Sequence, residues 1–262
     1  MTLSLCLEML FRDLPFTERL RRAARLGYRA IEFWDWRDKD LSEVTREAVG
    51  QGLTVAAISG NRKHALVDPC ARTGLVEEMK QVLDVAGRLN CRHLMMLSDV
   101  LQPDGSAAPV PPAAARVKVA SIVDGLRELA PLAESANITL LLEPLNTVLD
   151  HRGCFLDSSD VGVEVVRRVN SARVKLLYDI YHMSMMGEDA LEELPKKLEW
   201  IGYLHVADMP GRHEPGTGRL NYGAVNGRLR QLGYRGFLGM EFSALASDED
   251  AARAALRLFA AA

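Results

Sequence analysis

The chain has almost no excess of charge and no long apolar run. Its 32 Lys and Arg residues nearly balance its 35 Asp and Glu residues, for a formal net charge of -3. A strongly basic face of the kind that nucleic acids or anionic membranes attract is therefore not expected. No apolar run approaches the roughly 18 residues of a membrane-spanning helix, and the first residues lack the pattern of a signal peptide. These absences predict a cytoplasmic protein with neither nucleic acid nor a membrane as partner.

Cysteine motifs and phosphate-binding glycine motifs are absent as well. The four cysteines are Cys6, Cys70, Cys91 and Cys154, and they form no CxxC pair. Cys6 and Cys91 lie in apolar runs and are expected to be buried thiols in a reducing compartment. No glycine follows the first apolar run, in LEMLFRDLPF, and no GxxxxGKS/T motif occurs. A dinucleotide-binding doubly wound sheet and a phosphate-loop enzyme are therefore disfavoured.

What the sequence does contain is a regular alternation of short apolar runs and amphipathic segments. The apolar runs are predicted to be strands buried on both faces. They lie at 3–9, 28–34, 53–59, 93–98, 138–143, 174–179, 202–207 and 237–242. The predicted helices are Thr17–Leu26, Leu41–Gln51, Gly74–Leu89, Ala113–Ser135, Ser159–Val169, Asp189–Glu199, Val225–Leu232 and Asp248–Ala261. This order predicts an α/β fold, a (β/α)8 TIM barrel that forms a single domain over residues 1–262.

Residues at the helix ends agree with this division of the chain. Gly27, Gly52 and Gly233 each follow an amphipathic segment, as glycines that end helices do. Thr17 and Ser159 are expected to cap the N-termini of their helices.

Four successive strands reach an ionisable residue just where the strand should stop. These residues, called the strand-end cluster below, are Glu143, Asp179, His205 and Glu241. One strand-end carboxylate alone is as often structural as functional, so the recurrence carries the argument. The carboxyl ends of barrel strands open onto one face, and a shared cation there would neutralise charges that are costly beside a buried run. Three carboxylates and one imidazole suit Mg²⁺, Mn²⁺ or Co²⁺ better than a structural zinc.

The segments around these residues resemble the xylose isomerase-like barrels. EPLNT, YDIYHM, HVADMPGRHEPGTGRLNY and GYRGFLGMEF are most similar to the hydroxypyruvate isomerase family, with sugar 3-epimerases as relatives. The resemblance implies that the strand-end cluster binds a divalent metal and that Glu143 and Glu241 also form the acid/base pair. It further implies that His182 and Arg212 hold substrate oxygens beside the metal. Hydroxypyruvate isomerases often carry glutamine at the position of His205, whereas the epimerases carry histidine.

Other side chains are candidates for the same face of the barrel. Arg212 is suited to grip a substrate carboxylate with two parallel hydrogen bonds. His64, on the loop after the third strand, is a candidate for substrate binding, and Asn146 is expected to orient Glu143 or to contact substrate. Trp34 either lines the pocket or simply packs, and Glu32 is expected to be structural.

These features predict an isomerase of a small hydroxy-oxo acid, of the type that converts hydroxypyruvate to 2-hydroxy-3-oxopropanoate. A divalent cation would polarise the carbonyl and stabilise an enediolate, while the two glutamates move the proton between adjacent carbons. The alternative is a 3-epimerase or isomerase of a ketose or a longer sugar acid: Arg212 favours an acid, and His205 favours the epimerases. A sugar-binding barrel without turnover is a third possibility. A multi-zinc endonuclease would need more than the six histidines present, and composition leaves a homo-oligomer open.

Overall fold

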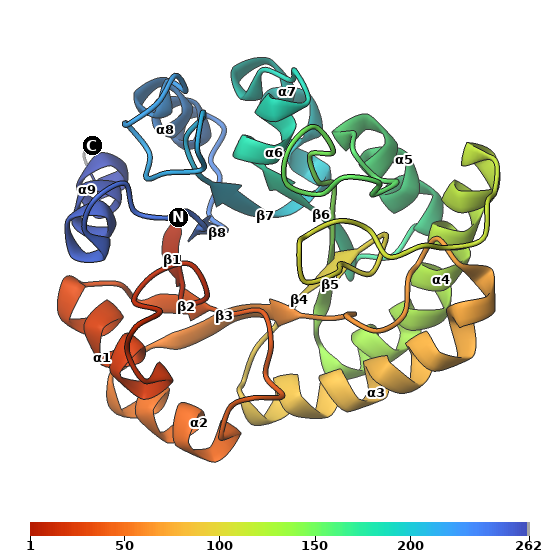
Figure 1. Ribbon diagram of the computed structural model, residues 1–262, viewed down its shortest axis with the longest axis horizontal. Coiled ribbons are helices and arrows are strands. Elements are labelled where there is room, and N and C mark those ends of the chain that lie inside the picture. The colour runs from red at the N-terminus through yellow and green to blue at the C-terminus, as the bar shows by residue number, and fades with distance from the viewer. Residues whose placement is uncertain (261–262) are drawn as a thin grey trace.

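Short apolar segments pair side by side in the order of the sequence and close into a barrel in the computed structural model, which describes residues 1–260 (Figure 1). Every neighbouring pair is parallel, including the pair that closes the barrel, β1 with β8. The strands are β1 (Thr2–Cys6), β2 (Ala30–Glu32), β3 (Thr54–Ser59), β4 (His93–Leu97), β5 (Thr139–Glu143), β6 (Val174–Asp179), β7 (Ile201–Val206) and β8 (Phe237–Met240). Closure leaves no free sheet edge. The prediction of a (β/α)8 barrel is confirmed.

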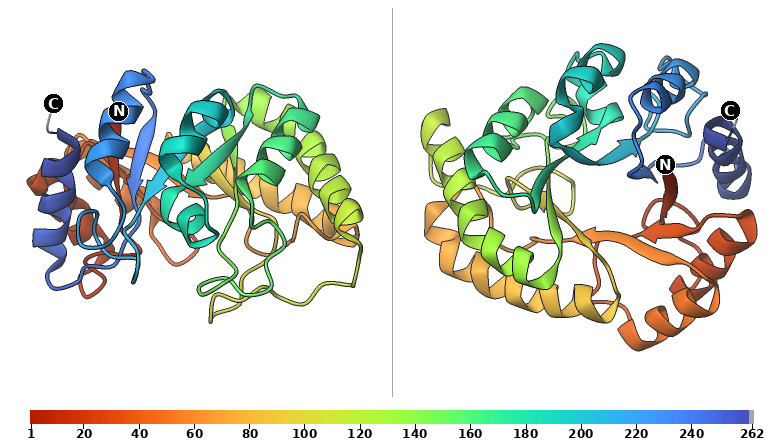
Figure 2. Two further views of the ribbon diagram at one scale, coloured as in Figure 1. Left: turned by 90° about the horizontal axis from the view of Figure 1, so that it is seen from above. Right: turned by 180° about the vertical axis from the view of Figure 1, so that it is seen from behind.

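The helices surround the barrel as an outer ring (Figures 1 and 2). The α-helices are α1 (Phe16–Leu26), α2 (Leu41–Gly50), α3 (Arg72–Arg88), α4 (Ala115–Ala136), α5 (Ser159–Val169), α6 (Ile180–Met185), α7 (Ala190–Lys197), α8 (Tyr222–Gln231) and α9 (Asp248–Ala260). Two 3-10 helices, Pro69–Ala71 and Leu198–Trp200, adjoin α3 and α7. None of the helices within residues 1–260 is long and apolar enough to cross a membrane.

One helix was not predicted. Asp179, the last residue of β6, accepts hydrogen bonds from the backbone N–H groups of Tyr181 and His182 and so starts α6 directly at the strand end. His182 therefore lies in the first turn of a short helix and not in a loop.

The predicted N-caps are wrong, whereas the predicted terminal glycines are confirmed. Thr17 lies inside α1, and the hydroxyl of Ser159 donates to Glu188 without capping α5. Gly27, Gly52 and Gly233 have φ values of 102°, 66° and 70°, the left-handed backbone that glycine adopts without cost.

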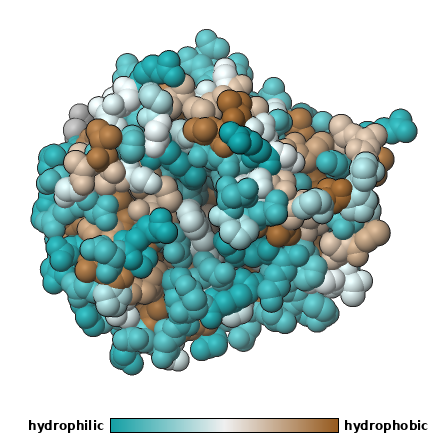
Figure 3. Space-filling model, viewed as in Figure 1, coloured by the Kyte–Doolittle hydropathy of each residue, from teal (hydrophilic) through white to brown (hydrophobic). Residues whose placement is uncertain are grey.

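Two apolar layers hold the barrel together. The larger lies between the strands and the helix ring, where nearly all leucine and valine side chains of the strands and inner helix faces are buried. A smaller cluster fills the barrel interior and includes Met95, Leu141, Leu177 and Tyr203. This packed interior forms a floor beneath the carboxyl ends of the strands. The outer surface in Figure 3 is mostly hydrophilic, with hydrophobic residues in scattered spots.

Candidate metal centre and active site

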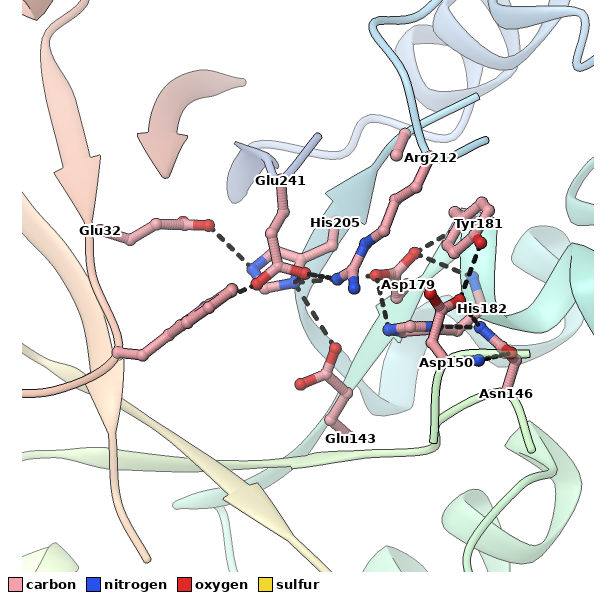
Figure 4. A network of polar contacts seen from close by, with 12 residues as sticks. Glu32, Glu143, Asn146, Asp150, Asp179, Tyr181, His182, His205, Arg212 and Glu241 are labelled. Carbon is pink, nitrogen blue, oxygen red and sulfur yellow. Dashed lines mark hydrogen bonds and ion pairs between the residues drawn. The ribbon is translucent and has the colours of Figure 1, made fainter. Parts of the chain in front are cut away.

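The strand-end cluster comes together in space. Glu143 and Asp179 end β5 and β6, His205 is the last residue but one of β7, and Glu241 follows β8 directly. In the barrel, Asp179 and His205 are register partners on adjacent strands. One ligand atom from each of the four residues lies within 4.8 Å of the others, and all four residues are buried. Figure 4 shows their polar ends pointing toward a common centre.

Three of the atoms that face this centre lack hydrogen-bond partners. They are Glu143 Oε1, Asp179 Oδ2 and His205 Nδ1. His205 Nδ1 lies 3.4 Å from Glu241 Oε2, 3.5 Å from Glu143 Oε1 and 4.0 Å from Asp179 Oδ2. Buried polar atoms are nearly always paired, so several that converge without partners are the pattern expected of a cation site.

The charges in the cluster are strongly coupled. Burial raises the pKa of the Glu143 carboxyl and raises that of Asp179 to about 7. Burial opposes ionisation of Glu241 as well, but the positive charges of His205 and Arg212 hold its pKa well below the usual value. Burial also works against a charged His205, yet the pKa of its imidazole is raised well above normal by Glu241 and neighbouring carboxylates. The raised pKa values of Glu143 and Asp179 mean that full ionisation of the cluster needs a further positive charge.

His205 is held from behind by a carboxylate. Glu32, the last residue of β2, places Oε1 3.0 Å from His205 Nε2, on the side away from the cluster (Figure 4). The Tyr203 hydroxyl donates to the other oxygen of Glu32. The contact has an ion-pair distance but not the geometry of a hydrogen bond, since His205 Nε2 and Glu32 Oε1 both lack hydrogen-bond partners. A carboxylate in this place favours a proton on Nε2 and leaves Nδ1 toward the cluster.

A glycine of β8 makes room for this pair. A side chain at Gly239 would place its Cβ 2.5 Å from the His205 ring and 2.7 Å from both oxygens of Glu32. Any larger residue at position 239 would push the two groups apart.

Glu241 is held by two further donors. The Trp34 indole donates from Nε1 to Glu241 Oε1 over 2.8 Å, and the Arg212 guanidinium donates to Oε2. Arg212 also lies over the ring of Tyr181, 5.5 Å from its centroid, and its Nε has no partner. The guanidinium thus lies beside the cluster with a free donor, and Trp34 contacts the site as well as packing.

The loop that carries Arg212 is shaped by a buried carboxylate. Asp208 is fully buried and accepts hydrogen bonds from the backbone N–H groups of Met209, Gly216 and Leu220. Arg212 itself has a φ of 56°, a backbone conformation that residues other than glycine rarely adopt. Three charge-assisted hydrogen bonds to one carboxylate stabilise this conformation of the loop.

Of the remaining predicted residues, one lies at the cluster and two make other contacts. His182 belongs to the site: its ring is buried, and Nε2 lies 3.6 Å from Asp179 Oδ2. Burial and the charge of Arg212 lower the pKa of the His182 imidazole well below normal. Asn146 contacts His182 and not Glu143. His64 is not brought to the cluster, because its Nδ1 pairs with Glu78 at 3.1 Å and its ring packs against Gly74 of α3.

A divalent cation fits the residues present. Within residues 1–260, the cationic side chains that pair with the four buried carboxylates (Glu32, Glu143, Asp179 and Glu241) are Arg212 and, when protonated, His205. If all four carboxylates are ionised, they exceed these two cations by two charges. The donor set of carboxylate oxygens with one imidazole is the one that Mg²⁺, Mn²⁺ and Co²⁺ accept.

Comparison with known proteins identifies the family. A sequence model described as a xylose isomerase-like TIM barrel matches residues 20–262. The chain belongs to this family. Among its xylose isomerase-like relatives, a putative hydroxypyruvate isomerase of Streptomyces coelicolor is 30% identical over 258 residues, covering 90% of this chain and 88% of the relative. A 2-oxo-tetronate isomerase of Cupriavidus necator is 28% identical over 244 residues and covers 90% of each chain.

A solved structure agrees with the same family. The crystal structure from Brucella melitensis described as an AP endonuclease of family 2 superposes with a TM-score of 0.87 at 26% identity, covering 99% of this chain and 98% of that one. The predicted resemblance to the hydroxypyruvate isomerases and the prediction of an isomerase are confirmed by these comparisons.

Two groups of residues around the cluster were not predicted. Glu32 was expected to be structural, although it ends a strand in the same way as Glu143 and Asp179. In the sequence the predicted strand 28–34 continues past Glu32, so the rule of strand-end carboxylates did not mark it. Asp208 had no such signal, and neither did Asp150, which accepts hydrogen bonds from Asn146 and the Tyr181 hydroxyl. Both lie in loops whose paths the sequence does not reveal.

Proposed function

We propose that this protein isomerises a small hydroxy-oxo acid, of the hydroxypyruvate or 2-oxo-tetronate type, with a divalent cation held by the strand-end cluster. The observation that supports this most strongly is the convergence of four buried ligand atoms within 4.8 Å, beside an arginine with a free donor. The names of the hydroxypyruvate and 2-oxo-tetronate isomerase relatives support the same substrate class.

Glu143, Asp179, His205 and Glu241 would hold the cation, with Mg²⁺, Mn²⁺ and Co²⁺ as the candidates. When bound, the cation would polarise the substrate carbonyl and make the neighbouring C–H bond more acidic. Glu32 would keep the Nδ1 lone pair of His205 directed at it.

Proton transfer falls to the two glutamates. Isomerisation removes a proton from the carbon beside the carbonyl and returns one to the adjacent carbon. Glu143 and Glu241 extend from β5 and β8 toward the same centre, and both are almost fully buried. Trp34 and Arg212 hold both oxygens of Glu241, whereas Glu143 has no donor besides the nearby His205. Glu143 is therefore the freer of the two to take the proton, with Glu241 the more restrained partner.

Arg212 would bind the carboxylate of the substrate. Its guanidinium side chain is only 15% exposed, so a carboxylate bound there would be largely shielded from water. Its Nε is unpartnered, and a planar guanidinium presents donors in the spacing that a carboxylate accepts. His182 would donate to a substrate oxygen nearer to Asp179.

A 3-epimerase of a ketose is the second candidate. Two carboxylates that approach one centre from different strands also suit the removal of a proton from one face of a carbon and its return to the other.

The proposed cytoplasmic location agrees with four free cysteines, three of them buried.

The test is turnover by chelator-stripped protein with Mn²⁺ or Mg²⁺ restored. The substrates are hydroxypyruvate, a four-carbon 2-oxo acid and free ketoses. Metal-restored isomerisation of an oxo acid is expected. Activity on ketoses alone would move the function to epimerisation, and silence on every substrate would refute both.

A further inference from the structure

The two ring nitrogens of His182 have different surroundings. Nδ1 lies 2.7 Å from the amide nitrogen of Asn146, whereas Nε2 has no hydrogen-bond partner and lies 3.6 Å from Asp179 Oδ2. The whole side chain is buried. Figure 4 shows the ring between Asn146 on one side and Asp179 on the other.

The orientation of the Asn146 amide follows from its other partners. Its Oδ1 accepts hydrogen bonds of 3.1 Å from the backbone N–H groups of both Leu149 and Asp150. Its Nδ2 donates over 2.7 Å to Asp150 Oδ2, which also accepts from the Tyr181 hydroxyl over 2.8 Å. A backbone N–H can only donate and a carboxylate can only accept. The amide oxygen and nitrogen of Asn146 therefore cannot be exchanged without losing all of these bonds.

With the amide fixed in this way, the proton on His182 has one possible place. The group that faces Nδ1 is an NH₂ donor, so Nδ1 must accept, and a neutral imidazole then carries its proton on Nε2. We propose that Asn146 is a positioning residue that holds His182 as the Nε2–H tautomer, so that the ring offers a hydrogen-bond donor, and not a base, to a substrate oxygen at the strand-end cluster.

This assignment divides the chemistry between histidine and glutamate. A ring with its lone pair tied to Asn146 cannot abstract a proton with Nε2, which leaves that task to Glu143 and Glu241. Its N–H is instead fixed in advance near the place where negative charge would develop on oxygen. One such preorganised donor accounts for about 10²- to 10³-fold in kcat in other enzymes. The donor role rests on the proposed function, but the tautomer does not.

Exchanging two residues reverses the tautomer and turns the Tyr181 hydroxyl from a donor into an acceptor at position 150. In Asn146→Asp/Asp150→Asn, the carboxylate at position 146 can only accept, so His182 must carry its proton on Nδ1. The amide at position 150 can donate to that carboxylate, and the net charge is conserved. Asp150→Asn alone is the matched control, because its amide oxygen can still accept from Asn146 and the His182 tautomer should not change.

The readout is a long-range ¹H–¹⁵N correlation spectrum of metal-free protein labelled in histidine, with His182→Gln to assign the signals. Wild type and Asp150→Asn should show the proton on Nε2, and the exchange variant should show it on Nδ1. A wild-type proton on Nδ1 would overturn the proposal, and this spectrum decides the tautomer even if the exchange variant does not fold.

Kinetics and metal binding test the donor role. The exchange variant should lose about 10²-fold in kcat, while its affinity for Mn²⁺ measured by calorimetry stays close to that of Asp150→Asn. A reversed tautomer with undiminished kcat would refute the donor role. Wild-type protein without any turnover would refute the proposed function, and the tautomer would still be decided by the spectrum.

Discussion

The melting temperature of Asp179→Asn should equal or exceed that of the wild type without metal and fall below it with metal. Asp179 Oδ1 accepts two backbone N–H bonds at the start of α6, and an asparagine oxygen can keep both. The unpartnered Oδ2, by contrast, adds a negative charge to the cluster once the Asp179 carboxyl, whose pKa is about 7, is ionised. Without metal, the substitution removes a buried charge that is poorly compensated, so the variant should melt no lower than the wild type.

With metal the order should invert. A ligand that binds only the folded state, present at 100 times its dissociation constant, stabilises by about 2.7 kcal/mol. In a domain of this size that corresponds to a rise of roughly 5–10 °C in Tm. Wild-type protein should show this rise with excess Mn²⁺, whereas Asp179→Asn, which has lost a charged ligand, should show little of it.

The assay is differential scanning calorimetry of chelator-stripped protein with and without Mn²⁺. Asp208→Asn is the matched control, since Asp208 is an equally buried carboxylate that accepts three backbone N–H bonds outside the cluster. It should destabilise the protein by about 1–3 kcal/mol both with and without metal, and leave the Mn²⁺ shift intact. Equal Mn²⁺ shifts in the wild type and Asp179→Asn would refute this reasoning.

Three further predictions, with five substitutions between them, test other parts of the site. Glu143→Gln or Glu241→Gln should lower kcat at least about 10²-fold with an unchanged circular dichroism spectrum, and retained turnover would exclude them as the proton-transfer pair. Glu32→Gln, and likewise Gly239→Ala, should weaken Mn²⁺ binding about 10- to 100-fold by titration calorimetry, and unchanged affinity would show that the support behind the imidazole is not needed. Arg212→Lys should raise KM for an oxo acid more than for a ketose. Equal changes for the two substrates would argue against a carboxylate contact.

The strands and the convergence of the strand-end cluster could be predicted because both follow from local pattern. A buried parallel strand is a short apolar run, and its carboxyl end can be read from the sequence. Glu143, Asp179, His205 and Glu241 are each found by that rule alone, and their meeting follows from barrel closure. Glu32 escapes the rule because the predicted strand 28–34 continues past it, whereas β2 ends at Glu32 in the structure.

The contacts made by loops could not be predicted in the same way. Asn146 and His182 are 36 residues apart, and neither lies at a position that a period of 2 or 3.6 would mark. Helix α6 was missed because Asp179 has two roles, strand-end carboxylate and helix cap, so the run after it looked like a loop. His64 was expected near substrate from its place after β3, yet the buried carboxylate of Glu78 pairs with its ring.

The most direct test of the central claim is isomerisation in D₂O by chelator-stripped protein, with Mn²⁺ added back and the product analysed by mass spectrometry and NMR. The account predicts that turnover depends on metal and that deuterium enters at the carbon that receives the proton, and that Glu143→Gln abolishes both. Turnover that needs no metal, or a product free of solvent deuterium, would contradict proton transfer by glutamates at a metal centre.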